Sequence, residues 1–300
     1  MQHDVAIIGG SFAGLAAATY LARARQRVCV IDSGRPRNRF ADASHGFLGH
    51  DGSDPARILQ AARDQLAAYP TVSFVAGEAV DAGRDGDGFL VRLGGDSGSP
   101  LSARRLILAF GLHDDLPGLP GLRDRWGKSA IHCPYCHGYE FADRPLGVLY
   151  RVPMSAHQAM LVADWGPTTL YMNGAPRLDD ETLAKLAARG VQVVPDPVRA
   201  LHGERCALDS IELDDGSRLP LEALYVAPQS RLASPIARGL GCTVEDGPAG
   251  EMLVTDADRQ TDVPGVYAAG DIARAPHSVS WAVADGVTAG TAVHRASVFG

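Results

Sequence analysis

Lysine, cysteine and long apolar runs are all scarce in this sequence of 300 residues. Lysine occurs only at Lys128 and Lys185, and the formal net charge is −7. Without a basic stripe, the chain is not expected to bind nucleic acid. No apolar run approaches the roughly 18 residues that span a bilayer, so no membrane segment is expected either. The first apolar run, Val5–Ile8, has no positively charged segment before it, which is typical of a strand rather than a signal peptide. The sequence therefore predicts a cytoplasmic protein.

Only five cysteines are present, and two of them form a single C-x-x-C in the stretch HCPYCHGYE, residues 132–140. By itself this pattern fits a redox dithiol, half of a zinc site or, with His137, the C-x-x-C-H that attaches c-type haem. No second C-x-x-C or C-x-x-H pair is available to complete a structural zinc site. A cytoplasmic location argues against covalent haem. The pattern therefore favours a redox pair, Cys133 and Cys136.

The N-terminal stretch DVAIIGGSFAGLAAATYLARARQRVCVIDSG, residues 4–34, predicts a β-α-β unit. An apolar strand at 5–8 leads through a glycine turn into a helix over 12–24, and a second strand follows at 28–31. In the turn, Gly9 allows the sharp reversal and Gly14 allows the helix to pack close to the strand, as in dinucleotide-binding folds. Ser11 replaces the usual middle glycine, but its small side chain still leaves room for a pyrophosphate at the helix N-terminus. Asp32, at the end of the second strand, is placed to accept ribose hydroxyls.

Two later stretches have the same strand-then-turn character. Residues 104–121 contain a buried strand at 106–109 that breaks at Gly111 into a Pro- and Gly-rich link. Residues 261–273 contain a strand at 266–269 that ends at Gly270-Asp271, before a helix expected over about 281–293. Together and in this order, the three stretches resemble the flavin-contacting segments of the flavoprotein disulfide reductases with two dinucleotide-binding domains. The C-P-Y-C between the second and third stretches resembles that of low-molecular-weight thioredoxin reductases.

This resemblance implies an α/β fold with two Rossmann-like, three-layer domains, the second inserted in the first. The FAD-binding domain would comprise residues 1–113 and 237–300, and the insert, with the C-x-x-C, residues 114–236. Within the insert, the sequence predicts strands at 146–150, 168–172 and 191–194, a helix at 156–164, and a hairpin followed by a buried strand over 206–228. The resemblance also implies a homodimer. The residues expected to bind FAD are Gly9, Ser11, Gly14, Asp32, Ser33, Gly111, Gly270 and Asp271.

The insert lacks the glycine turn that binds NADPH pyrophosphate in thioredoxin reductases. Where glycines are expected, the sequence has Tyr150, Arg151, Val152 and Pro153. Bulky side chains and a missing N–H oppose close approach of a phosphate to the backbone. Arg151 itself is expected to be a surface arginine, and we expect NADPH not to be the electron donor.

A missing NADPH turn and a histidine after the second cysteine resemble the FAD-dependent dithiol oxidases that close disulfides in natural products such as gliotoxin, holomycin and romidepsin. This resemblance implies a small-molecule dithiol substrate, a Cys133–Cys136 redox disulfide, and reoxidation of the flavin by O2 to give H2O2. We expect His137 to act as the base, with Glu140 either orienting its imidazole or solvated. His45 and His50, in the loop at 44–52, are candidates for shaping the pocket, and no metal is expected.

Three alternatives remain open at this point. The chain could be a thioredoxin reductase that uses another donor such as ferredoxin, or an NADPH-dependent reductase with an unusual turn. It could also be a flavin-binding regulatory or structural protein with incidental cysteines. Sequence does not separate these alternatives, because loops of unknown arrangement build the substrate pocket.

Overall fold

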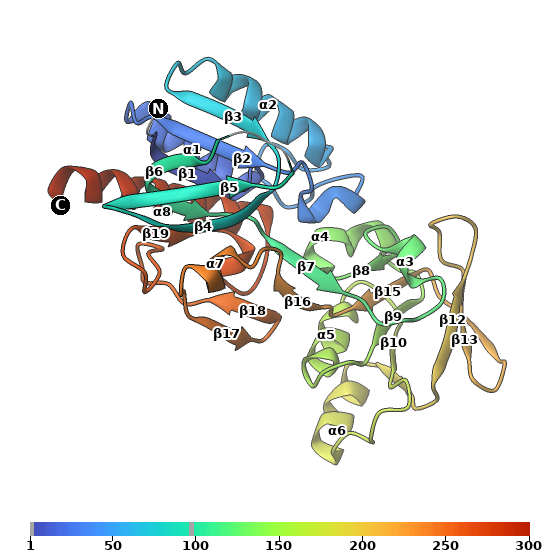
Figure 1. The fold of residues 1–300 in the computed structure, drawn as a ribbon. Helices are drawn as coiled ribbons and strands as arrows, with labels where there is room; N and C mark the ends of the chain where they lie inside the picture. Colours follow the sequence, from blue (N-terminus) through green and yellow to red (C-terminus); the bar gives the residue numbers. More distant parts are fainter. Residues whose placement is uncertain (1–2, 96–98) are drawn as a thin grey trace. The chain divides into compact units, whose positions relative to one another are not determined.

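The computed structural model describes residues 3–95 and 99–300, and the contacts divide the chain into two compact units. Unit 1 comprises Met1–Arg39, Phe47–His113 and Ser230–Gly300, and unit 2 comprises Phe40–Gly46 and Asp114–Gln229. Relative to the expected boundaries, residues 40–46 belong to unit 2 and residues 230–236 belong to unit 1. Figure 1 shows the chain coloured along its sequence.

Unit 1 is built on a seven-stranded sheet in the order β3-β2-β1-β6-β5-β4, with β19 also paired to β6. Strands β1, β2, β3, β6 and β19 are parallel, and β4 and β5 form an antiparallel hairpin joined to β6. The strands are β1 (His3–Ile8), β2 (Val28–Asp32), β3 (Val72–Ala76), β4 (Ala79–Asp85), β5 (Gly88–Leu93), β6 (Leu101–Leu108) and β19 (Val266–Ala268).

Alternate residues of these strands feed two separate cores, as the two-residue period of a strand requires. Val5 and Ile7 of β1 face a core shared with the helices α1 (Phe12–Arg23), α2 (Pro55–Ala67) and α8 (Val279–Phe299). Ala6 and Ile8 face the core on the other side, against the β4–β5 hairpin and α7 (Ile236–Gly239). The central strand is therefore buried on both faces, which explains its continuous apolar sequence.

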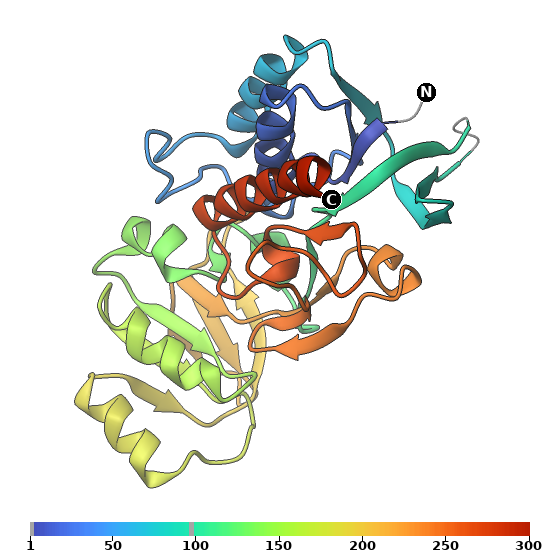
Figure 2. The same cartoon turned by 90° about the vertical axis from the view of Figure 1, so that its left-hand side faces the viewer.

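Helices α1 and α8, far apart in the sequence, pack side by side in both views (Figures 1 and 2). A Cβ added at Gly286 of α8 would lie 2.1 Å from the backbone oxygen of Ala13 in α1. At Gly290, one turn later, it would lie 2.9 Å from the oxygen of Ala17. The glycines let the two backbones approach closely, so the C-terminal helix supports the first β-α-β unit.

A smaller sheet in the order β17-β18-β16-β7 contains the two points where the chain passes between the units. Its strands are β7 (Leu112–Asp115), β16 (Gln229–Leu232), β17 (Val244–Gly247) and β18 (Gly250–Leu253). The short 3-10 helices are η1 (Arg37–Phe40), η2 (Tyr139–Phe141) and η3 (Asp271–Ala273).

Unit 2 has a five-stranded parallel sheet in the order β11-β10-β9-β15-β8 and an antiparallel meander β12-β13-β14. Its helices are α3 (Leu122–Arg125), α4 (Pro134–His137), α5 (Met154–Val162) and α6 (Asp180–Ala188). Its strands are β8 (Ala130–Ile131), β9 (Leu146–Leu149), β10 (Thr168–Tyr171), β11 (Gln192–Val194), β12 (Val198–His202), β13 (Ser210–Leu213), β14 (Arg218–Pro220) and β15 (Ala223–Val226).

One face of this sheet buries Val148 and Leu170 against α5 and α6, and the other buries Leu149 and Tyr171 against the meander. This architecture confirms the expected α/β fold with two Rossmann-like domains.

Two predicted helices differ from those observed. Helix α5 begins at Met154, two residues before the prediction, because Pro153 is accommodated as the residue preceding the first turn. Helix α8 continues to Phe299, six residues beyond the prediction, because no glycine or proline interrupts residues 294–299. Among the residues that the structure describes, no helix is long and apolar enough to cross a membrane.

Candidate active site

The glycine turn between β1 and α1 has the close packing that a dinucleotide-binding turn needs. Gly9 has φ +115°, and a Cβ there would lie 2.2 Å from the backbone oxygen of Ala109. A Cβ at Gly14 would lie 1.9 Å from the backbone oxygen of Gly9. Both positions therefore require glycine, the first at the reversal and the second where the helix meets the strand end.

The N-terminus of α1 is suited to an anion. Ser11 precedes the helix, but its side chain makes no capping hydrogen bond, and the first turn contains no acidic residue. The first turn of the helix thus has neither a side-chain cap nor an acidic residue of its own. Together with the positive end of the helix dipole, its first amides suit the pyrophosphate of a dinucleotide.

Asp32, at the end of β2, lies beside the same turn. Its Oδ1 accepts from the Gly34 N–H at 3.2 Å, with Ser33 between them. Its Oδ2 accepts from Arg63 Nη2 at 2.5 Å, and the same nitrogen donates to the Gly10 carbonyl at 2.8 Å. Arg63 belongs to α2 and links the carboxylate to the glycine turn. Sequence reasoning missed it, because one arginine in an amphipathic helix gives no signal.

The third predicted segment also lies against α1. Gly270 has φ +81°, and a Cβ there would lie 3.0 Å from the Cβ of Ala13. Asp271 follows and pairs with Arg37 at 2.9 Å, an arginine that sequence reasoning missed. Gly111 also has positive φ, +75°, with nothing within 4 Å of a Cβ, so only its backbone conformation favours glycine.

A buried carboxylate, also missed, supports this segment from behind. Asp285 of α8 is 2% exposed and pairs with Arg259 at 2.7 Å and with Arg274 at 3.0 Å. It also accepts from the Gly270 N–H. Burial raises the pKa of Asp285, while the two guanidinium groups act in the opposite direction. The turn, Asp32 and this segment fit FAD, because they combine phosphate donors, a ribose acceptor and strand ends that pack around glycine.

The redox segment lies in unit 2. Cys133 and Cys136 form a disulfide, with their Cα atoms 5.3 Å apart, around the one-turn helix α4. Both cysteines are partly buried, while Tyr135 between them is 72% exposed. A Cβ at Gly138 would lie 2.4 Å from the Pro134 oxygen and 2.9 Å from the ring of Trp165. Gly138 thus lets the segment fold back tightly on the body of unit 2.

Two histidines and a glutamate meet beside this disulfide, also within unit 2. His45 Nε2 lies 3.3 Å from Glu140 Oε1, and the rings of His45 and His137 meet edge to face with centroids 5.8 Å apart. Burial lowers the pKa of His137; the charge of His45 acts in the same direction, and Glu140 opposes it. The Glu140 carboxylate contacts His45, and its ligand atom also lies within 4.8 Å of that of His137. His50 is outside the cluster and stacks on Phe47 at 5.2 Å.

In place of the NADPH turn, the β9–α5 connection is filled by its own side chains. Ser155, which is fully buried, accepts at Oγ from the N–H groups of Arg151 at 3.1 Å and Val152 at 3.3 Å. Pro153 has no N–H to offer. Arg151, expected at the surface, is only partly exposed and donates to the carbonyls of Asp115 and Ala227, both at 3.1 Å. Burial lowers the pKa of its guanidinium.

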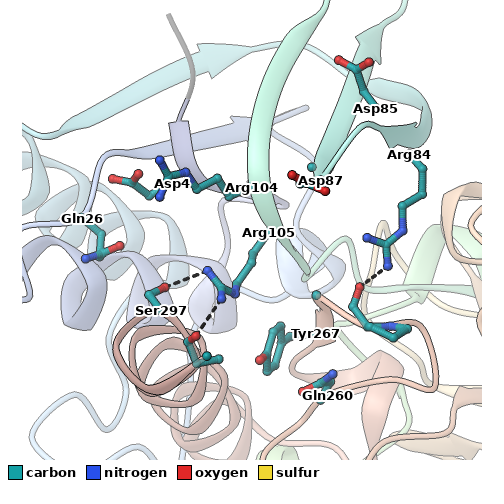
Figure 3. A pocket seen from close by; sticks show the side chains of 15 residues that line it. Asp4, Gln26, Arg84, Asp85, Asp87, Arg104, Arg105, Gln260, Tyr267 and Ser297 are labelled. Atoms are coloured by element: carbon teal, nitrogen blue, oxygen red, sulfur yellow. Dashed lines mark hydrogen bonds between the residues drawn. The ribbon is translucent and has the colours of Figure 1, made fainter.

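A surface pocket of about 830 Å³ in unit 1 is lined by none of these residues (Figure 3). Asp4 lines it near the start of β1 and Arg105 lines it from the middle of β6, whereas Gly9 and Gly111 follow the carboxyl ends of these strands. Arg105 is held by the carbonyl of Ala296 at 2.7 Å and the hydroxyl of Ser297 at 2.9 Å. Ligands of parallel α/β sheets bind at the carboxyl ends of strands, so this pocket is not the cofactor site.

Comparison with known proteins identifies the family. The sequence profile of the pyridine nucleotide-disulphide oxidoreductases matches residues 3–286. The chain belongs to this family. It is therefore an oxidoreductase, and it binds FAD, as the family's thioredoxin-reductase-like flavoproteins do.

Relatives narrow the resemblance further. Thioredoxin reductase tcpT of Claviceps purpurea is 33% identical over 96% of this chain and 92% of its own length. Among solved structures, an oxidoreductase from Agrobacterium tumefaciens is 45% identical, with a TM-score of 0.94 over 100% of this chain and 99% of that one. The structure of HlmI is 38% identical, with a TM-score of 0.92 over 99% of this chain and 93% of that one. The expected resemblance to thioredoxin-reductase-like flavoproteins is confirmed.

Proposed function

We propose that this oxidoreductase is an FAD-dependent dithiol oxidase, which forms a disulfide in a small-molecule dithiol and passes the electrons to O2. The observation that carries the proposal is the filled β9–α5 connection in the same unit as the Cys133–Cys136 disulfide. The enzyme has a redox disulfide but lacks the turn through which NADPH would supply electrons. The substrate dithiol is then the electron source.

The energetic cost of binding NADPH at this connection supports electron transfer from the dithiol rather than from NADPH. A pyrophosphate bound there would have to replace the Ser155 hydroxyl as acceptor for the Arg151 and Val152 N–H groups. Each hydrogen bond contributes about 1 kcal/mol net, and Ser155 would then be left buried without these partners, at a cost of about 1–3 kcal/mol. The Arg151 guanidinium is already committed to two carbonyls. NADPH binding would have to overcome these losses.

The chemistry begins at the disulfide. A substrate thiolate attacks the sulfur of Cys133, a mixed disulfide forms, and Cys136 leaves as a thiolate. The second thiol of the same substrate, once deprotonated, attacks the substrate sulfur of this mixed disulfide. This step releases the cyclic disulfide and the Cys133 thiolate. Two electrons and two protons have then passed from the substrate to the enzyme. Bound FAD supplies the two-electron transfer from the enzyme dithiol to O2, so that one H2O2 forms for each disulfide.

Side chains around the disulfide provide the accompanying proton transfer. We assign His137 the role of proton acceptor, since it directly follows Cys136 and is partly buried beside it. We assign FAD binding to the residues expected from the sequence: Gly9, Ser11, Gly14, Asp32, Ser33, Gly111, Gly270 and Asp271. By family resemblance we also propose that the protein is cytoplasmic and forms a homodimer. Light scattering on the purified protein tests the homodimer.

A second candidate, a reductase that uses a different donor, is favoured by the names of the relatives tcpT and sirT, both called thioredoxin reductases. Anaerobic mixing separates the two functions. The FAD-loaded protein is mixed with NADPH or with dithiothreitol, and bleaching of the flavin absorbance is followed. We expect rapid bleaching by the dithiol and little by NADPH, and then one H2O2 per oxidised dithiol when air is admitted. Rapid bleaching by NADPH would refute the proposal, and dithiol bleaching without peroxide would favour the second candidate.

A further inference from the structure

The two histidines and the glutamate beside the redox segment have the composition of a metal-binding site. His45, His137 and Glu140 each offer one ligand atom, and these atoms lie within 4.8 Å of one another. They come from two separate stretches of unit 2, the segment 40–46 and the segment around α4 and η2. A bound ion would therefore join these stretches.

The donor set and its spacing suit a divalent transition metal. Two imidazoles with one carboxylate are ligands of zinc, in sites that keep a fourth position for water. Ligand atoms about 2.0–2.1 Å from a tetrahedral ion lie roughly 3.4 Å from each other. His45 Nε2 and Glu140 Oε1 are 3.3 Å apart, so this pair already has the spacing required. The ligand atom of His137 lies within 4.8 Å of the other two, so a shift of at most about 1.4 Å, from 4.8 to 3.4 Å, completes the set.

Accessibility also suits a binding site. The side chain of Glu140 is 39% exposed and that of His45 is 21% exposed. An ion therefore has an approach from solvent on the Glu140 side, while the partly buried imidazoles limit competition by water. An ordinary surface ion pair would explain His45 and Glu140 alone, but it gives no reason for the second imidazole to share the cluster.

We propose that His45, His137 and Glu140 form a binding site for a divalent transition metal, represented by Zn²⁺. A bound ion occupies a lone pair of His137 and fixes its ring, so the imidazole no longer accepts a proton. Zn²⁺ then inhibits turnover reversibly. This inhibition rests on the proposed function, whereas metal binding does not, so the two are measured separately.

Binding is tested by calorimetric titration of the untagged, FAD-loaded and fully oxidised protein with Zn²⁺ alone. The closed Cys133–Cys136 disulfide cannot supply thiolates, and a Cys206→Ser background removes the exposed free thiol. We expect one ion per chain, and at least about tenfold weaker affinity in His45→Ala and in Glu140→Gln. The matched control is His50→Ala, which removes a histidine of unit 1 outside the cluster and should leave the affinity unchanged.

Absorption by Co²⁺ provides an independent readout, since its visible bands report the coordination geometry. We expect tetrahedral bands that disappear in His45→Ala and persist in His50→Ala. Absence of binding, or affinity that His45→Ala and Glu140→Gln leave unchanged, would overturn the proposal. If Zn²⁺ binds as expected but does not slow dithiol oxidation, the metal site stands and the assigned role of His137 fails.

Discussion

Replacing Gly9 by alanine is predicted to weaken FAD binding strongly, and the structure allows the cost to be worked out. At φ +115°, an alanine occupies a backbone region that costs on the order of 1–3 kcal/mol. Its Cβ would lie 2.2 Å from the Ala109 oxygen, whereas ordinary contact begins at 3.4 Å. The turn or the end of β6 must therefore move by 3.4 − 2.2 = 1.2 Å, and overpacking of this kind costs about 1–3 kcal/mol.

The two contributions sum to about 2–6 kcal/mol, and the strain falls on the turn that approaches the pyrophosphate. Since 1.4 kcal/mol corresponds to a factor of ten, even the lower value predicts about 30-fold weaker FAD affinity. The assay is FAD content per chain after gel filtration, followed by titration of the apoprotein with FAD by flavin fluorescence. The matched control is Gly86→Ala, in the exposed β4–β5 turn, where φ is +57° and a Cβ would meet nothing within 4 Å. Equal FAD affinity in the two variants would refute the reasoning.

Further predictions concern the redox pair, the buried acid and the pH dependence of stability. Cys133→Ser and Cys136→Ser should each abolish dithiol oxidation while keeping FAD, since the glycine turn belongs to the other unit; turnover in either variant would contradict the mechanism. Asp285→Asn should lower the free energy of unfolding by about 3–5 kcal/mol, because two partly buried guanidinium groups lose their buried charged partner. Asp258→Asn, at an exposed ion pair, should cost no more than about 1 kcal/mol, and urea denaturation compares the two. Hydrogen bonding and pairing with Arg27 lower the pKa of Asp4 in the folded protein. The stability that Asp4 contributes is therefore present above its pKa in the unfolded chain, and it is lost as the pH falls through its pKa in the folded protein. Urea titrations at neutral and acidic pH should show wild type and Asp4→Asn converging in acid, and a constant difference would contradict this.

Elements with a local signal were predictable from the sequence. The first β-α-β unit shows an apolar run, a glycine turn and a helical period within 31 residues, and β1, α1 and β2 form there. The hairpin β13–β14 was likewise indicated by the turn residues Asp214, Asp215 and Gly216. In each case the interactions that decide the structure lie close together in the sequence.

Contacts between distant segments were not predictable in the same way. Arg63 contacts Asp32, and Asp285 of α8 pairs with Arg259, but none of these pairs has a sequence motif. The contact of Glu140 with His45, which is 95 residues away (140 − 45), likewise has no sequence signal. A single sequence reports periodicity and turn chemistry, whereas these pairs depend on which elements pack together.

The β9–α5 connection combines both kinds of information. The sequence alone shows that glycines are missing, which predicts weak NADPH binding. It does not exclude a turn of unusual sequence that still binds NADPH. The structure adds that Ser155 satisfies two N–H groups and that Arg151 is bonded to the carbonyls of Asp115 and Ala227. A phosphate turn would leave such donors open to its ligand. Here the donors serve the fold of unit 2 itself, so losing them costs stability, which supports the proposal that a dithiol rather than NADPH supplies the electrons.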